Sequence, residues 1–200
     1  MRQNKVIHIS FTPEGIELAY RYGIFPMANS VTGDIYWCRP EPRAIIPLDG
    51  FHISRSLAKV IRQNRFEITF DTDFEGVMRC CADRKEGTWI SEDFIQVYGE
   101  MHQLGKAHSV EAWKDGKLVG GTYGVSLGAA FMAESMFHYE TNASKVVLAA
   151  LVSRLNERGY ELLDVQYLTS HLKSLGAVEI PHQNYMLLLH AALKKDRNFN

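Results

Sequence analysis

An Asp-Gly dipeptide at residues 115–116 places the strongest constraint on how this chain can fold. It lies between the runs HSVEAW (108–113) and KLVGGTYGV (117–125). Asp-Gly satisfies a type I′ turn, whose twist matches that of two paired strands, so we predict a β-hairpin here. The run AAFMAESMF (129–137) predicts a third strand. The chain therefore builds a sheet around residues 108–137.

Helical patterns lie on both sides of this sheet-forming region. Thr12 before Pro13 is typical of a helix start and predicts a helix over 13–22. Further helices are predicted from Ser54, from Ser91 to a stop at Gly105, over 144–158 and over 183–195, with another strand over 161–168. Residues 23–47 hold four of the six prolines and are predicted to be loop-rich. The combination predicts an α+β, or mixed α/β, fold.

Composition narrows the function classes. The 200 residues are 46% hydrophobic and suit one domain with a small appendage. A formal net charge of -1 leaves only a local cluster to hold nucleic acid. Residues 1–10 lack the apolar run of a secretion signal, and no run approaches the ~20 apolar residues of a membrane span, so the cytoplasm is expected. Three cysteines suit neither a disulfide framework nor a metal site and are interpreted as structural.

Asp164 and Gln166 are the first candidate site residues. Strand alternation over 161–168 places both side chains on one face of an otherwise apolar strand. Removal from water raises the pKa of a carboxyl group, which suits proton transfer near neutrality. Asp164 would equally serve as the structural partner of a Lys or Arg. The strand alone leaves both readings open.

Glu134 is the second candidate. Alternation places it on the same strand face as Met132 and Met136, so its carboxylate is expected to enter a methionine-lined cavity. The alternative is that both methionines simply belong to the core. A charged residue in the middle of an apolar strand favours the ligand site.

A basic stripe and a loop tryptophan could serve nucleic acid. Arg55, Lys59 and Arg62 share one helical face, with a spacing that suits phosphates or an ordinary solvated surface. Trp89 could stack on a base or act as a packing lid. Nucleotide-loop, nucleophile-elbow and zinc-protease motifs are absent, so no cofactor is predicted.

A series of ordered segments resembles the leucyl/phenylalanyl-tRNA–protein transferases between residues 12 and 185. The segments are YRYGIFPM, PEPRA, HISRS, EGTWI, LGKAHSVEAW, GGTYGV, ESMF, NASK, LLDVQ and SLGAVEIP. The resemblance implies a small amino-terminal domain, 1–43, and a GNAT-like catalytic domain, 44–200, used without acetyl-CoA. It also implies transfer of Leu or Phe, less readily Met, from aminoacyl-tRNA to proteins beginning with Lys or Arg, which marks them for N-end-rule degradation.

The resemblance also implies roles for individual residues. Asp164 and Gln166 match the proposed catalytic pair, and Glu134 matches the acid of the ESMF motif. Phe131, Met136, Leu151 and Leu163 fall where the family lines the donor side-chain pocket. Trp89 matches a tryptophan associated with the terminal adenosine, and Arg55, Lys59 and Arg62 match positions that hold the acceptor stem. Two departures are Met27, where tryptophan is usual, and Thr122, where methionine is common in the pocket.

The expected mechanism aligns the acceptor amine, whose free pKa is about 7.7–8.0, with an already activated ester. Asp164, linked through Gln166, would accept the proton, or would only position the amine while a ribose hydroxyl passes it. Two rival functions are an acyl-CoA N-acetyltransferase and a non-enzymatic module that binds RNA or peptides. The first would need an R/Q-x-x-G-x-G/A loop, which does not follow the GGTYGV run or any other.

Overall fold

A computed structural model describes residues 9–29, 31–84 and 87–200. Its main sheet has seven strands in the order β4-β5-β6-β7-β8-β3-β9. Their bounds are β3 Arg43–Ile46, β4 Glu67–Phe70, β5 Ala107–Lys114, β6 Lys117–Leu127, β7 Ala130–His138, β8 Leu162–Gln166 and β9 Val178–Ile180. Within this sheet β7 and β8 are parallel, and the other paired neighbours are antiparallel. The expected mixed α/β fold is confirmed.

The predicted hairpin is the β5–β6 turn. Asp115 and Gly116 have φ values of 52° and 71°, the left-handed conformation that a type I′ turn requires at both central residues. The strands pair from Lys114 opposite Lys117 to Ala107 opposite Val125. The turn thus fixes the register between β5 and the longest strand of the sheet, β6.

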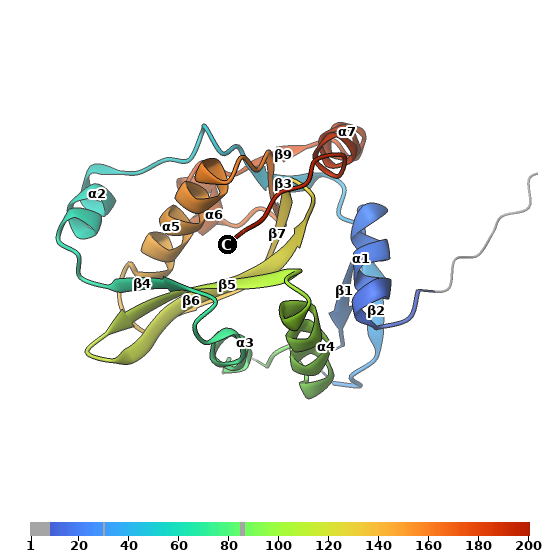
Figure 1. Ribbon diagram of the computed structural model, residues 1–200, viewed down its shortest axis with the longest axis horizontal. Coiled ribbons are helices and arrows are strands. Elements are labelled where there is room, and N and C mark those ends of the chain that lie inside the picture. Colours follow the sequence, from blue (N-terminus) through green and yellow to red (C-terminus); the bar gives the residue numbers. More distant parts are fainter. Residues whose placement is uncertain (1–8, 30, 85–86) are drawn as a thin grey trace, which may run out of the picture.

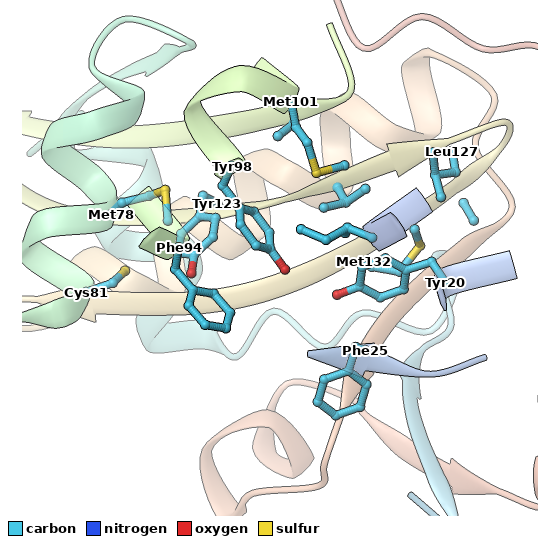
Figure 2. Packing of buried hydrophobic residues seen from close by; sticks show 14 of the residues in the cluster. Tyr20, Phe25, Met78, Cys81, Phe94, Tyr98, Met101, Tyr123, Leu127 and Met132 are labelled. Atoms are coloured by element: carbon cyan, nitrogen blue, oxygen red, sulfur yellow. The ribbon is translucent and has the colours of Figure 1, made fainter. Parts of the chain in front are cut away.

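Helices cover both faces of the sheet (Figure 1). On one face, α3 (Phe74–Ala82) and α4 (Glu92–Gln103) pack over β5 and β6, and their aromatic and methionine side chains fill the core shown in Figure 2. On the other face lie α2 (Arg55–Arg62), α5 (Ala143–Glu157) and α6 (Ser170–Ser174), which bury a second cluster. The sheet therefore separates two hydrophobic cores.

The amino-terminal part is small and packs beside α4. It contains α1 (Pro13–Arg21) and a two-stranded antiparallel ribbon of β1 (Phe25–Ala28) and β2 (Ile35–Cys38). Thr12 caps α1, its hydroxyl accepting from the Gly15 amide at 3.2 Å. The loop-rich prediction for 23–47 missed these strands and β3, because four-residue strands are too short for alternation to reveal. The domain boundary at 43/44 stays a prediction.

The parallel strands β7 and β8 are paired over only part of their length. Pairing joins only Ala130–Met132 to Leu162–Asp164. Beyond these residues the two strands no longer pair, and the sequence then continues through α6 and β9 into α7 (His182–Ala192). None of the described helices is long and apolar enough to cross a membrane. The expectation for the start of the chain concerns residues 1–8, which lie outside the described ranges.

Candidate active site

A cavity of about 350 Å³ lies between the unpaired parts of β7 and β8. Its walls come from β6, β7, β8, α6 and the loop before α4. Among the residues expected from sequence, those that line it are Trp89, Thr122, Glu134, Met136 and Gln166. Arg84, Tyr167 and His171 also line it and had no sequence-based assignment. Residues from distant parts of the chain thus meet where the parallel strands separate.

A bulge in β7 sets the direction of Glu134. Tyr123 pairs with Ser135, but the adjacent Gly124 pairs with Ala133, so Glu134 has no residue opposite it. Glycine is needed beside this bulge, because a Cβ at Gly124 would lie 2.4 Å from the Met132 carbonyl oxygen.

The bulge also separates the two methionines. Met132 is buried in the core under α4, whereas Met136 packs against the opposite cluster and lines the cavity. The prediction that Glu134 shares one face with both methionines is therefore wrong.

The Glu134 carboxyl group receives a hydrogen bond from the Tyr20 hydroxyl of α1. Tyr20 is fully buried in the same core as Met132 (Figure 2). Burial, with a smaller contribution from the charge of Asp164, raises the pKa of Glu134 well above its ordinary value. The site therefore favours a neutral, protonated Glu134 while no cation is bound beside it.

Asp164 has a different environment. Its side chain is fully buried and accepts four hydrogen bonds. Arg43 donates from Nε to Oδ1 at 2.9 Å and from Nη2 to Oδ2 at 2.6 Å. The Tyr185 hydroxyl donates to Oδ2 at 2.8 Å, and the Gln166 backbone amide donates to Oδ1 at 3.0 Å. Asp164 does not line the cavity, so the geometry matches the structural alternative, in which it pairs with an arginine.

Arg43 was not identified as a site residue. Its side chain is fully buried, its Nη1 donates to the Gly23 carbonyl oxygen at 3.1 Å, and its guanidinium lies 4.9 Å and 4.6 Å from the ring centres of Phe25 and Tyr185. A buried charge is stable only when it is paired and hydrogen-bonded. The sequence signal for this pair is the arginine that begins the apolar run RAII, since a buried arginine requires an acidic partner.

Gln166 ends β8 in a left-handed conformation, with φ of 56°. The β3–β8 register shifts at this point: Ala44 pairs with Gln166 and Ile45 with Asp164. The predicted common face for Asp164 and Gln166 is therefore wrong, because the irregularity turns only Gln166 to the cavity. Gln166 is 6% exposed, and its Nε2 has no hydrogen-bond partner among the described residues. A ligand acceptor would satisfy this donor.

The remaining apolar candidates lie behind the cavity. Phe131, Leu151 and Leu163 are at most 1% exposed, pack in the core on the α5 side of the sheet and do not line the cavity. They support Met136, which packs against the same cluster. The expectation that these three residues line the pocket is corrected, because their strand and helix faces point into the close-packed interior.

Trp89 lines the cavity and also packs on the core, and its stacking on a base stays a prediction. It is partly exposed at the cavity wall, and its ring packs edge-on against Phe94 with 5.1 Å between the ring centres. Arg55, Lys59 and Arg62 are exposed along α2, which packs on α5 rather than at the cavity. None of the three forms an ion pair within the part of the chain that the structure describes. The stripe is therefore an available cationic surface.

The family model for leucyl/phenylalanyl-tRNA protein transferase matches residues 45–190, and the model for its N-terminal domain matches residues 10–41. A leucyl/phenylalanyl-tRNA–protein transferase of Chlorobaculum tepidum is 51% identical over 189 residues, covering 93% of this chain and 97% of that protein. The corresponding protein of Herpetosiphon aurantiacus is also 51% identical, covering 94% and 97%.

Among solved structures, L-PGS from Bacillus licheniformis matches with a TM-score of 0.50 and 14% identity, covering 90% of this chain and 70% of that one. This likeness concerns the fold alone. The family models span both the amino-terminal part and the sheet domain, and the relatives align over nearly their whole length. The chain belongs to the leucyl/phenylalanyl-tRNA protein transferase family and is an aminoacyltransferase.

Proposed function

We propose that this aminoacyltransferase moves Leu or Phe, and less readily Met, from aminoacyl-tRNA to the α-amine of proteins that begin with Lys or Arg. The product would carry a new amino-terminal residue that marks it for N-end-rule degradation in the cytoplasm. Family membership supports the coarser activity, transfer of an aminoacyl group from tRNA to protein. The finer specificity rests on the chemistry of the cavity.

The observation that carries this proposal is the cavity wall itself. Ala133, Met136, Val165 and Leu172 give it an apolar surface. Gln166, whose Nε2 has no partner among the described residues, lines the same wall. An apolar pocket selects by size and shape, and one methylene is worth only ~1–3 kcal/mol. Leu, Phe and Met are thus expected to share the site, while β-branched side chains fit it less well.

Gln166 would hold the reacting carbonyl group. A buried donor without a partner costs about 1–3 kcal/mol, which an ester carbonyl oxygen would recover on binding. The interaction strengthens as that oxygen gains negative charge, so it favours the transition state over the ground state. In this arrangement Asp164 is a positioning residue: it accepts from the Gln166 backbone amide and keeps this residue at the cavity.

Glu134 would bind a cation. A positive charge beside its carboxyl group offsets the burial that now favours the protonated form. The acceptor's Lys or Arg side chain, or the donor's own ammonium group, supplies such a charge. Trp89 at the cavity wall would stack on the terminal adenosine. Outside the cavity, Arg55, Lys59 and Arg62 would contact phosphates of the acceptor stem.

One transfer assay tests the whole proposal. The protein is incubated with labelled Leu-tRNA and matched peptides that begin with Arg, Lys or Ala, and the new amino terminus is identified by mass spectrometry. Leu on the Arg and Lys peptides only is the expected result. Transfer from acetyl-CoA instead would support the acetyltransferase alternative, and tRNA binding without transfer would support the binding module.

A further inference from the structure

Aminoacyl transfer needs a group that takes a proton from the attacking amine, and the Asp164–Gln166 pair is poorly placed to supply it. Both Asp164 oxygens already accept two hydrogen bonds each, inside a fully buried side chain away from the cavity. Gln166 carries an amide, which is not basic near neutrality. If the protein supplies the proton acceptor, it lies among the titratable side chains of the cavity wall.

The titratable side chains at this wall are Arg84, Glu134, Tyr167 and His171. Arg84 carries a guanidinium group, which offers donors and no acceptor, and it donates to the Ser135 hydroxyl at 2.7 Å. Burial favours the protonated form of Glu134 in the free protein, and the cation that it is proposed to bind would occupy its ionised form in the substrate complex. Burial is also the main reason that the pKa of Tyr167 is raised, so its phenolate is disfavoured as well. His171 is left as the base.

His171 lies in α6, five positions after Gln166. Thr169 caps this short helix by accepting from the Leu172 amide at 3.1 Å, which fixes the turn that carries the imidazole. The imidazole Nε2 is shielded from solvent and has no hydrogen-bond partner among the described residues. The cavity is therefore lined by two residues with unpartnered side-chain nitrogens, on Gln166 and on His171.

We infer that His171 is a catalytic base of this enzyme, which takes the proton of the attacking α-amine and returns it to the departing ribose oxygen. This inference rests on the proposed function. The amine nitrogen forms a bond to the ester carbonyl carbon, and His171 takes up the amine proton. The carbon–oxygen bond to the ribose then breaks, and the imidazolium protonates the leaving oxygen. The products are a peptide bond and free tRNA, with no net proton consumed.

The surroundings keep this histidine in its basic form. Burial lowers the pKa of His171 below its ordinary value, and so do the charges of Lys145 in α5 and His138 at the end of β7. On the other walls the facing titratable groups are Arg84, Glu134 and Tyr167. In the free protein, burial thus favours the neutral forms of both His171 and Glu134 at one cavity, and titratable groups with such shifted pKa values cluster at functional sites.

The first test uses single-turnover transfer of Leu from Leu-tRNA to an Arg peptide. His171→Gln and His171→Ala are expected to lower the rate by roughly 10²–10⁴-fold while tRNA binding stays near normal. Added imidazole is expected to restore part of the rate of His171→Ala, and a series of substituted imidazoles should give faster rescue as their basicity rises. A purely structural role would give no such dependence.

The second test leaves the histidine in place. Lys145→Met removes a positive charge that lowers the pKa of His171, so the acid limb of the single-turnover rate should move to higher pH. The peptide amine titrates identically with both enzymes and cannot cause this shift. Lys173→Met, which removes an exposed lysine of α6 that does not line the cavity, is the matched control.

Two results would overturn the inference. One is a near-normal rate for both histidine variants. The other is a rate loss that no imidazole rescues together with an unmoved acid limb for Lys145→Met. If the unmodified enzyme itself transfers no Leu to the Arg peptide, the proposed function fails instead, so the two failures are distinguishable.

Discussion

Two carboxylic acids flank the opening between β7 and β8, and their environments differ sharply. Asp164 on β8 is fully buried and accepts four hydrogen bonds, two of them from Arg43. Glu134 on β7 accepts one from Tyr20 and lines the cavity. The saturated acid fixes the backbone around it, whereas the acid with one partner keeps capacity for a ligand. Position in an apolar strand therefore does not by itself identify a catalytic carboxylate.

Removing the cation beside Asp164 should have the largest effect. Arg43→Met leaves a buried carboxylate without its charged partner and should lower the free energy of unfolding by about 3–5 kcal/mol. Urea denaturation measures this loss. The double variant Arg43→Met, Asp164→Leu should recover part of it, because replacing a buried ion pair with apolar groups is far less costly than breaking it. If Arg43→Met left the urea midpoint unchanged, Asp164 would not depend on its ion pair with Arg43.

A matched pair of tyrosine variants compares the two acids directly. Tyr185→Phe removes a donor to the ion-paired Asp164 and should cost about 1.5–3 kcal/mol, as expected for a hydrogen bond to a charged group. Tyr20→Phe removes the donor to Glu134 and should cost only about 0.5–1.5 kcal/mol near neutral pH. Both hydroxyls are lost from buried rings, so each variant controls for the other. Equal losses in the free energy of unfolding, measured by urea denaturation, would refute the difference assigned to the environments of Asp164 and Glu134.

The pH dependence of the free energy of unfolding tests the difference between Glu134 and Asp164 further. The pKa of Glu134 is raised in the folded state, so the folded protein binds more protons than the unfolded one above the unfolded value of about 4.3. The contribution of Glu134 to the free energy of unfolding is therefore lost as the pH rises above about 4.3 towards the raised pKa of the folded state. The loss is at most about 1.4 kcal/mol per pH unit. Glu134→Gln abolishes the loss. Its advantage over the unmodified protein in urea denaturation should be small at pH 4.5 and should grow towards pH 7.5; a constant difference would exclude this assignment.

The smallest expected effect concerns the turn that Asp164 supports. Gln166→Ala and Gln166→Gly both remove the amide, but alanine keeps a Cβ in the left-handed conformation. The glycine variant should be more stable by about 1 kcal/mol, as thermal unfolding would show. Both variants should lose transfer activity to a similar degree. Greater activity in the glycine variant would mean that the backbone, rather than the amide, is what the reaction needs.

The sequence was sufficient to predict the hairpin and most of the helices. It also singled out Glu134, Asp164 and Gln166, whose roles in the reaction stay predictions. The sequence did not predict correctly the direction in which these side chains point. A bulge at Glu134 and a register shift at Ala44–Ile45 each change the alternation by one residue, and neither has a local composition signal. Because these one-residue shifts were not predicted, strand alternation placed Met132 and Asp164 at the cavity.

Contacts between residues far apart in the sequence were also not predicted. Arg43 lies 121 positions from Asp164, and Tyr185 lies 21 positions from it, so neither contact follows from local periodicity. His171 was overlooked because eight scattered histidines show no ligand spacing. Its significance depends on the parallel strands separating beside α6, which only the three-dimensional arrangement reveals.

The guanidinium of Arg43 joins three parts of the chain that are far apart in sequence: the carbonyl of Gly23, the carboxylate of Asp164 and the ring of Tyr185. Swinging the amino-terminal part away from the sheet would break the contact with Gly23 and expose the buried charge. Hinged movement of that part would therefore carry the cost of uncovering a buried ion pair. Under the proposed function, the substrates are expected to enter the cavity without such a movement.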